Sequence, residues 1–122
     1  MKIIETTGQQ VRFETVESKG RDYLVARRSS GGTWEILDIE VATERRKRIG
    51  HSLVEALLRW LPVDCPTVYV ITRIDNEVAQ QFYEKLQFDC CAVLRRFYRD
   101  SPFPRHASAD AVMYARFPRG PI

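Results

Sequence analysis

An apolar helical stripe set between two strand-like segments constrains the fold of this chain more than any other feature. In residues 49–60 the apolar side chains recur at helical spacing, and Pro62 ends the stripe. Residues 33–41 read as a strand, and residues 67–72 form a nearly continuous apolar strand of the kind that is buried on both faces. A helix between two such strands predicts a right-handed crossover. The stripe consists of Ile49, Leu53, Ala56, Leu57 and Trp60.

The flanking segments complete a mixed α+β (α/β) pattern. We expect about six strands and two main helices, in one domain that spans residues 1–122. With 122 residues, 44% of them hydrophobic, the chain is long enough to bury a core without metal or disulfide support. The second helix is expected to begin near Asp75 or Asn76, either of which can cap it. Further strands are expected at residues 11–17, 22–27, 88–98 and 111–117, a polar loop at residues 100–110, and the second helical stripe at Val78, Ala79, Phe82, Tyr83 and Leu86.

Charge and cysteine content favour a cytosolic protein. A formal net charge of +3 is compatible with an anionic ligand or with an ordinary basic surface. Cys65, Cys90 and Cys91 show neither a disulfide framework nor the Cys-x-x-Cys spacing of a zinc site. We therefore expect packing cysteines, no metal and a reducing cytosol. The sequence has neither the apolar run of a signal peptide nor one of about 18 residues that would span a membrane, so a soluble, cytoplasmic protein is expected.

A short basic segment, residues 45–48, leads into the first helix and predicts an anion site. Helix N-termini leave backbone N–H groups unpaired and carry a partial positive charge, so they bind phosphate readily. Gly50 would let a phosphate approach the backbone closely, and the basic side chains add a long-range attraction. The alternative is that residues 45–48 form only a solvated basic turn. The segment is neither a Walker loop nor a dinucleotide-binding fingerprint.

These residues resemble the acetyl-CoA loop of the GNAT acetyltransferase superfamily, which reads Gln/Arg-x-x-Gly-x-Gly/Ala. Arg45-x-x-Arg48-x-Gly50 matches two of the three marked positions, and Arg48 stands where the family usually has glycine. The resemblance implies that Arg48 points away from the diphosphate, toward solvent or toward the 3′-phosphate of CoA. His51 is expected on the phosphate side or at the surface rather than as a catalytic base. The resemblance further implies that the pyrophosphate lies against the backbone of Arg46, Lys47, Arg48, Ile49, Gly50 and His51.

A second motif carries more of the likeness. Residues 76–88 look like the family segment Asn-x-x-Ala-x-x-Phe/Leu-Tyr-Glu-Lys-Leu-Gly-Phe, with Gln87 in place of the glycine. A third likeness, in residues 94–98 followed by 109–113, is to the RimI-like ribosomal-protein alanine N-acetyltransferases. Together the resemblance covers about residues 33–117.

The resemblance implies the GNAT fold, a mixed and mostly antiparallel sheet whose fourth and fifth strands splay apart around the pantetheine arm of acetyl-CoA. Main-chain groups of Ile39, Glu40 and Val41 would hold that arm. Family members normally have two helices before the segment that corresponds to Thr33, and these helices wall the acceptor site. Only strand-like segments fit there in this chain. The acceptor site is therefore expected either to be open or to be completed by another subunit, as in a homodimer.

Two residues of the second motif have an implied chemical role. Tyr83 matches the family tyrosine that protonates the departing thiolate, a feasible transfer because the pKa values of phenol and thiol lie within about two units. The alternative for Tyr83 is core packing with its hydroxyl at the rim. Asn76 matches the asparagine that binds CoA, and a simple helix cap explains this residue nearly as well.

The general base is less defined. RimI-like enzymes carry a glutamate on the fifth strand, but the matching residue here is Ile71, so that role does not transfer. Other family members use a glutamate on the fourth strand, where Glu35 fits best by its distance from the loop. In a regular strand Asp38 and Glu40 lie on the face opposite to Glu35, whereas a bulge would exchange the faces. The alternatives are that all three are solvated or ion-paired carboxylates and that a water chain serves as the base.

The resulting hypothesis is an acetyl-CoA-dependent N-acetyltransferase that acts on a primary amine, either a peptide N-terminus or a small amine, rather than on DNA. Acetyl-CoA would be the co-substrate, with no metal. The rival hypothesis is a non-catalytic acyl-CoA-binding module that regulates a partner protein. The missing N-terminal helices and Ile71 favour the rival, while Tyr83 argues against it. Nucleic-acid and membrane partners are not expected, since the basic charge is confined to the 45–48 turn and to residues 95–99.

Overall fold

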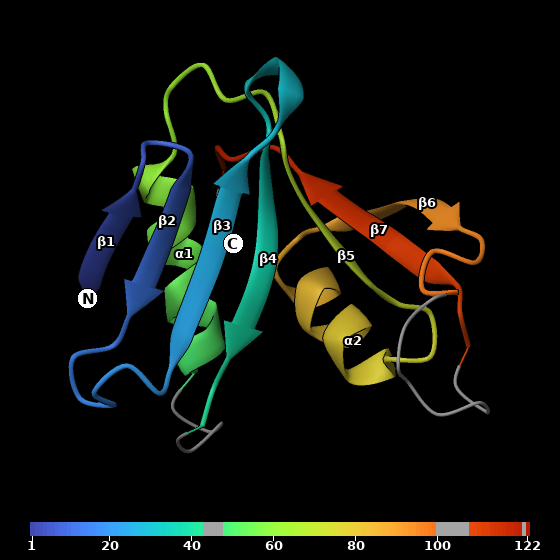
Figure 1. Cartoon of the computed structure of the whole chain (residues 1–122), viewed down its shortest axis with the longest axis horizontal. Coiled ribbons are helices and arrows are strands. Elements are labelled where there is room, and N and C mark those ends of the chain that lie inside the picture. Colours follow the sequence, from blue (N-terminus) through green and yellow to red (C-terminus); the bar gives the residue numbers. More distant parts are fainter. Residues whose placement is uncertain (43–47, 100–107, 121) are drawn as a thin grey trace. The chain divides into compact units, whose positions relative to one another are not determined.

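A computed structural model describes residues 1–42, 48–99, 108–120 and 122 (Figure 1). These residues form seven β-strands, two α-helices and one 3₁₀ turn, which is a mixed α+β architecture. Neither α-helix in this part of the chain is long and apolar enough to cross a membrane. The elements are β1 (Lys2–Thr6), β2 (Gln10–Glu14), β3 (Tyr23–Arg28), η1 (Ser30–Gly32), β4 (Trp34–Glu40), α1 (Ile49–Trp60), β5 (Val68–Arg73), α2 (Glu77–Lys85), β6 (Asp89–Leu94) and β7 (Ala111–Arg116).

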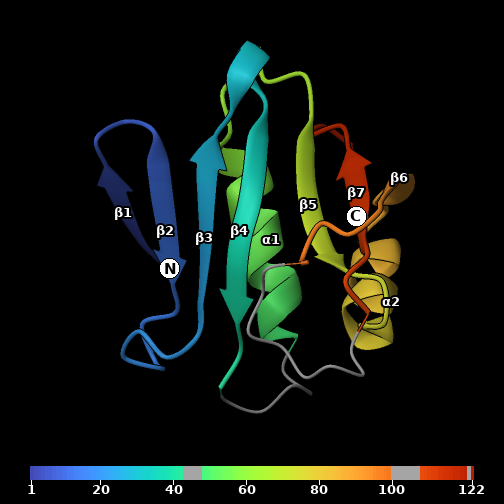
Figure 2. The same ribbon diagram turned by 45° about the vertical axis from the view of Figure 1, so that its right-hand side comes forward.

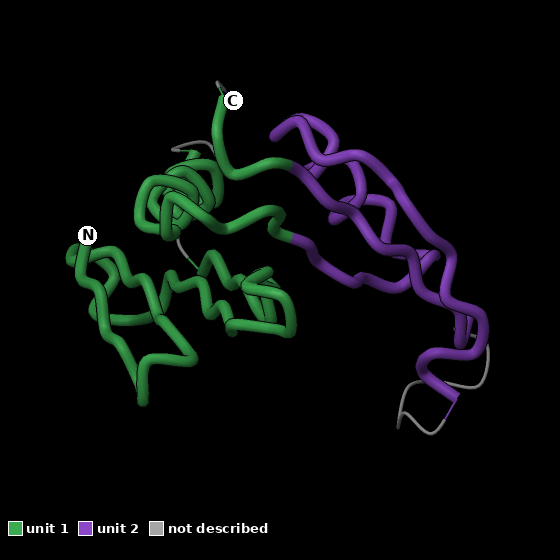
Figure 3. Tube along the Cα trace, turned by 90° about the horizontal axis from the view of Figure 1, so that it is seen from above, with its two compact units in different colours: residues 1–68, 117–121 green, residues 69–116, 122 purple. Residues whose placement is uncertain are grey.

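The chain groups into two compact units (Figure 3). Unit 1 comprises residues 1–68 and 117–121, and unit 2 comprises residues 69–116 with Ile122. Unit 1 therefore holds β1 to β4 and α1, whereas unit 2 holds α2, β6, β7 and all of β5 except its first residue. The single domain and the splayed fourth and fifth strands stay predictions.

Unit 1 is a four-stranded antiparallel meander in the order β1-β2-β3-β4, and α1 lies against one face of it (Figures 1 and 2). Phe13 of β2 and Trp34 of β4 both meet Trp60 of α1 edge-on, with ring centroids 5.9 and 5.1 Å apart. The buried face of α1 includes the predicted Leu53 and Leu57 and adds their neighbours Val54 and Leu58, so the stripe is wider than predicted. The helix ends at Trp60, because the residue before Pro62 is disfavoured in helical conformation and Leu61 is extended.

The strand β1 was not predicted. All five of its residues are exposed, so it has no buried face whose alternation would mark it as a strand. The turn that joins it to β2 has Thr7 and Gly8 at φ values of 59° and 74°, the left-handed pair that Asn-Gly usually supplies. A β-branched residue at the first of these positions is a weak turn signal. The β1–β2 hairpin lies in the part of the sequence where family members normally have two helices. In unit 1 no described helix covers the face of the strands opposite α1.

Unit 2 contains strands in the order β5-β7-β6, with β6 and β7 antiparallel. In α2 only Tyr83 is buried, and Leu86 is buried directly after the helix. Val78, which was predicted on the apolar stripe, is 68% exposed. The stripe is therefore shorter than its sequence pattern indicated, because the helix begins at Glu77 and its first turn lies outside the core.

Two strands end earlier than predicted. The segment β6 stops at Leu94 rather than at Tyr98, because Arg96 adopts a left-handed conformation at φ 56° and its N–H donates to Asp110 Oδ1 at 2.8 Å instead of joining a ladder. Similarly β2 ends at Glu14 rather than at residue 17, since the chain turns through Lys19 and Gly20 at positive φ. Most of the predicted loop 100–110 lies outside the described residues.

Candidate functional site

The start of α1 leaves backbone N–H groups without acceptors inside the helix. The first bond of this helix runs from the Ser52 N–H to the Arg48 carbonyl at 3.1 Å, so the N–H groups of Ile49, Gly50 and His51 belong to the first turn, which has no intrahelical acceptors. The first turn contains no acidic residue that would neutralise the partial positive charge of the helix end. Arg46 and Lys47 lie outside the described residues.

The backbone conformation of Arg48 accounts for the glycine that the motif usually has at this position. It is the N-cap residue of α1 and is left-handed, at φ 55° and ψ 35°. Glycine adopts this conformation without strain, whereas a residue with a Cβ does so at a cost. The arginine therefore retains the backbone shape that the glycine would give. Its guanidinium Nη2 lies 3.0 Å from His51 Nδ1, so the side chain contacts the helix start while the residue stays exposed.

His51 links the helix start to the next turn. Its Nε2 lies 3.3 Å from Glu55 Oε2, which in turn pairs with Arg59 at 2.7 Å. With Arg48 on one ring nitrogen and Glu55 on the other, both nitrogens of His51 have neighbours. This agrees with the prediction of a surface or phosphate-side role, and the contacts hold the imidazole at the helix start.

A buried aspartate that the sequence did not single out supports the end of β4. Asp22 is only 1% exposed, and its Oδ1 accepts a hydrogen bond of 2.7 Å from the Ala42 N–H, just after β4 ends. The Asp22 N–H donates to Ser18 Oγ at 2.9 Å, and Ser18 is equally buried. A buried carboxylate needs such partners. No sequence pattern indicated this buried hydrogen bond, because Asp22 was predicted only as the first residue of a strand.

A bulge in β4 places the candidate base residues on one face. Val25 pairs with Asp38 while Ala26 pairs with Ile36, so Leu37 is the extra residue. Because side chains alternate along a strand, the bulge brings Asp38 and Glu40 onto the same face as Glu35. This is the face of the unit 1 strands opposite α1, since Ile36 is buried on the α1 side. The prediction that a bulge would bring Asp38 and Glu40 onto the face of Glu35 is thus confirmed.

The three carboxylates differ in their contacts. Glu35 Oε1 accepts from Arg27 Nη2 at 2.9 Å, an ion pair across the β3–β4 ladder. Asp38 Oδ2 accepts from the Tyr23 hydroxyl at 2.9 Å, and this hydrogen bond, together with the charge of Asp38, raises the pKa of Tyr23. Glu40 is exposed at the end of the strand. Ile39 and Val41 are half-buried beside it, and Ile39 pairs with Leu24 on the α1 side.

In unit 2, Asn76 is the N-cap of α2. Its Oδ1 accepts a hydrogen bond of 3.1 Å from the Ala79 N–H, so the cap interpretation of this residue is confirmed and Asp75 is not the cap. Asp75 instead accepts from the Ser108 N–H at 3.0 Å. The cap engages the amide oxygen of Asn76, and a CoA-binding role would fall to the amide nitrogen.

Tyr83 is set in an aromatic cluster. Its ring is 3% exposed and meets Phe82 and Phe88 edge-on, with centroids 5.1 and 5.4 Å apart. Its carbonyl accepts from the N–H groups of Leu86 and Phe88, both at 3.0 Å, which closes the helix. The ring is therefore a packing element of unit 2, with an aromatic neighbour before it and one after it in sequence.

Three side chains, one of them within the second motif, fasten α2 to its unit. Gln80 Nε2 donates to the Ile74 carbonyl at 2.7 Å, and the Tyr114 hydroxyl donates to Glu84 Oε1 at 2.8 Å. Arg116, only 8% exposed, donates from Nη1 to the Leu86 carbonyl at 2.7 Å. Burial lowers the pKa of Arg116. The contacts of Tyr114 and Arg116 join residues 30 positions apart in sequence, so no local pattern predicts them.

Gln87, the second departure from a motif glycine, behaves like Arg48. Its φ is 69°, again in the left-handed region, and it directly follows the C-cap Leu86. Helices commonly end on a glycine in this conformation. Arg48 and Gln87 thus both have the left-handed backbone conformation that glycine adopts without strain.

Among the described residues, no group of three or more His, Cys, Asp or Glu side chains is placed to hold a metal ion. Cys65 is buried, as predicted for a packing residue. For Cys90 and Cys91 the packing prediction was wrong, because both are exposed. They lie on β6, the last strand in the order of unit 2, where one side of the strand has no neighbour in that unit.

Comparison with protein families gives one match. Residues 13–88 match the model described as the acetyltransferase (GNAT) family. The match begins before Thr33, so the likeness reaches further toward the N-terminus than the motifs alone indicated, and it includes the start of α1 and all of residues 76–88 with Tyr83. No curated protein matches the chain in sequence.

Several solved structures resemble the chain. The ribosomal-protein-S18-alanine N-acetyltransferase of Escherichia coli is 20% identical, with a TM-score of 0.76, over 95% of this chain and 74% of that one. An acetyltransferase of Bacillus subtilis in complex with CoA is 17% identical, with a TM-score of 0.73, over 88% of this chain and 75% of that one. Ard1 of Thermoplasma volcanium is 28% identical, with a TM-score of 0.64, over 79% of this chain and 62% of that one.

Proposed function

The chain belongs to the GNAT acetyltransferase family, whose members are acetyl-CoA-dependent N-acetyltransferases, and from this premise we propose that it transfers the acetyl group of acetyl-CoA to a primary amine, either a peptide N-terminus or a small amine. The observation that carries the proposal is the start of α1, where first-turn N–H groups, a left-handed N-cap and the absence of acidic residues in that turn come together. The Bacillus subtilis relative binds CoA, and the Escherichia coli relative acts on a protein alanine, which supports both halves of the proposal.

In the proposed complex the pyrophosphate of acetyl-CoA accepts hydrogen bonds from the backbone of residues 46–51. Arg48 and His51 stand beside it, and the helix N-terminus supplies partial positive charge. Main-chain groups of Ile39, Glu40 and Val41 hold the pantetheine arm, and an N–H of this segment faces the thioester carbonyl. The amide nitrogen of Asn76, which matches the CoA-binding asparagine of the family, is the proposed further contact to CoA.

The proposed chemistry is a direct attack of the amine on the thioester carbonyl, followed by departure of the thiolate. Tyr83 donates its phenolic proton to the leaving sulfur as general acid. Its ring is fixed between Phe82 and Phe88, which limits the entropy lost in aiming the hydroxyl. Glu35 accepts the proton of the amine, directly or through water, with Asp38 and Glu40 on the same face as the alternatives.

Turnover tests the enzymatic half of the proposal. Purified chain, acetyl-CoA and a panel of peptides and small amines would be followed by release of free thiol. We expect turnover with at least one amine, and we expect Tyr83→Phe to lower kcat by about 100-fold or more while acetyl-CoA binding is kept. No turnover above that of Tyr83→Phe across a broad panel would contradict the enzymatic claim.

Binding tests the other half. Acetyl-CoA should raise the melting temperature by mass action, equivalent to about 2.7 kcal/mol at 100 times Kd. The double variant Gly50→Glu with Arg46→Glu should lose this shift. Arg59→Glu reverses a charge at the opposite end of α1, where the side chain is 79% exposed, and should keep it. If the double variant keeps the shift, the pyrophosphate binds elsewhere.

The rival function is a non-catalytic acyl-CoA-binding module that acts on a partner protein. It is favoured by the β1–β2 hairpin, which precedes β3 where family members normally have two helices, and by Ile71 on β5. It predicts the thermal shift with acetyl-CoA but no thiol release with any amine. The two experiments together therefore separate the functions. A cytoplasmic location and a homodimer that completes the acceptor site remain part of the proposal.

A further inference from the structure

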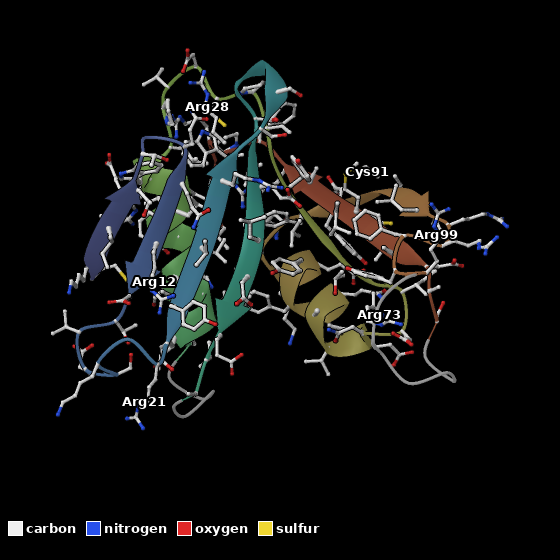
Figure 4. The ribbon with its side chains drawn as sticks, viewed as in Figure 1. Arg12, Arg21, Arg28, Arg73, Cys91 and Arg99 are labelled. Atoms are coloured by element: carbon white, nitrogen blue, oxygen red, sulfur yellow. The ribbon has the colours of Figure 1, made fainter. Side chains whose placement is uncertain are left out.

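The neighbouring cysteines of β6 have no part in the proposed acetyl transfer. Cys90 and Cys91 are both exposed, and they lie on the last strand in the order of unit 2 (Figure 4 labels Cys91). In a regular strand the side chains of two consecutive residues point to opposite faces, which would keep the two thiols apart. The local structure of β6 is not regular.

A bulge falls on this pair. Cys90 lies opposite Tyr114 and Ala92 lies opposite Met113, so Cys91 is the extra residue with no partner in the β6–β7 ladder. A bulge breaks the alternation of side chains and redirects one of them. The Cys91 thiol bends toward β7, where its Sγ donates to the Met113 carbonyl at 3.4 Å. Because the bulge breaks the alternation of side chains, the thiols of Cys90 and Cys91 need not point to opposite faces of the strand.

The electrostatics agree with this geometry. Burial against β7 raises the pKa of Cys91, and the charge of the neighbouring Cys90 raises it further. The Cys90 charge also contributes to the raised pKa of Tyr114, which lies across the ladder. Cys91 is therefore protonated at neutral pH.

The number of ligands limits what such a pair can bind. Structural zinc requires four ligands, and the described residues bring no third His, Cys, Asp or Glu side chain to this pair. Soft centres that prefer sulfur are satisfied by fewer ligands. Trivalent organoarsenicals, which carry one organic group and one oxide oxygen, need two thiols.

We propose that Cys90 and Cys91 form a two-thiol site at the β6 bulge that chelates a trivalent organoarsenical. Both As–S bonds form as the As–O bond breaks, and the two thiol protons leave with the oxide oxygen as water. Arsenic stays trivalent, so no oxidant or reductant takes part. The second As–S bond is intramolecular, and its effective concentration in the millimolar range makes the chelate resist single thiols.

Phenylarsine oxide is the probe, added at one equivalent to the reduced full-length chain. Arsenic content is measured after gel filtration, once in excess 2-mercaptoethanol and once in excess 2,3-dimercaptopropanol. We expect one arsenic per chain to survive the monothiol and to be removed by the dithiol. The two exposed thiols, Cys90 and Cys91, should become unreactive toward Ellman's reagent in the native chain. Loss of arsenic in 2-mercaptoethanol would overturn the proposal.

Variants assign the site. Cys90→Ser and Cys91→Ser should each lose retention in 2-mercaptoethanol, because a single thiol binds reversibly. Cys65→Ala is the matched control and should retain arsenic, since Cys65 is buried in unit 1. Both serine variants replace exposed side chains, and their melting temperatures will show that they fold. Retention by either serine variant, or loss in Cys65→Ala with its fold intact, would place the site elsewhere.

Discussion

The hydroxyl of Tyr114 on β7 donates a hydrogen bond of 2.8 Å to Glu84 Oε1, the residue that follows Tyr83 in α2. Tyr114 is 2% exposed, so its hydroxyl depends on this carboxylate for a partner. The bond fixes the rotation of α2 about its axis at the position next to the proposed general acid. It is a contact between two elements, and removal of either partner has measurable effects.

The first prediction concerns this bond. Tyr114→Phe should lower the free energy of unfolding by about 1–2 kcal/mol, since a hydrogen bond to a charged acceptor is lost and little volume changes. Urea denaturation measures the loss. Glu84→Gln keeps an acceptor oxygen and should cost less. A double-mutant cycle of the two changes should show coupling, and additive effects would mean that the bond does not form in solution.

The second prediction is that the contribution of Tyr114 to the free energy of unfolding depends on pH. Burial, followed by the hydrogen bond to Glu84, raises the pKa of Tyr114 from its ordinary value to about 12. The folded state therefore favours the protonated phenol. The stabilisation is complete below pH 10 and is lost as the pH rises toward 12.

The measurement is the difference in unfolding free energy between the parent chain and Tyr114→Phe at several pH values. It should be constant from about pH 7 to 9 and shrink above pH 10. A difference that grows with pH would contradict the assignment.

The third prediction concerns the two residues at positive φ in motif positions. Gln87→Gly should raise the free energy of unfolding by up to about 1 kcal/mol, because the left-handed strain is relieved and only part of the gain is offset by the entropy of glycine. Arg48→Gly should act in the same direction. Thermal denaturation measures both.

Gln81→Gly is the control for this pair of changes. Gln81 is exposed in the interior of α2, where glycine should lower stability by about 1 kcal/mol. If Gln87→Gly lowers the free energy of unfolding as Gln81→Gly does, residue 87 does not have a left-handed conformation in solution.

The fourth prediction concerns Asp22. Asp22→Ala removes the acceptor of the Ala42 N–H and should cost about 1–3 kcal/mol, while Asp22→Asn keeps an oxygen acceptor and should cost less. Glu40→Ala, an exposed carboxylate on β4, serves as the control and should stay within about 0.5 kcal/mol of the parent chain. Equal effects of Asp22→Ala and Glu40→Ala would show that the buried bond contributes nothing to stability.

Local sequence patterns determined the two helices, their limits and six of the seven strands. The spacing of Leu53 and Leu57 requires a helix with one buried face, and Pro62 and Asn76 act on the backbone next to them. The motif around Tyr83 likewise indicates the family. These are properties of short segments, so they can be read from adjacent residues.

Only the tertiary structure decided the relations between distant residues. The β4 bulge at Leu37, which brings Asp38 and Glu40 onto the face of Glu35, follows from pairing with β3 and not from the composition of β4. The burial of Asp22 against Ala42 depends in the same way on packing across 20 residues. Likewise, Cys90 and Cys91 read as packing residues until the ladder with β7 placed them on an exposed bulge. Pairing register and burial are set by all strands together, and no single segment encodes them.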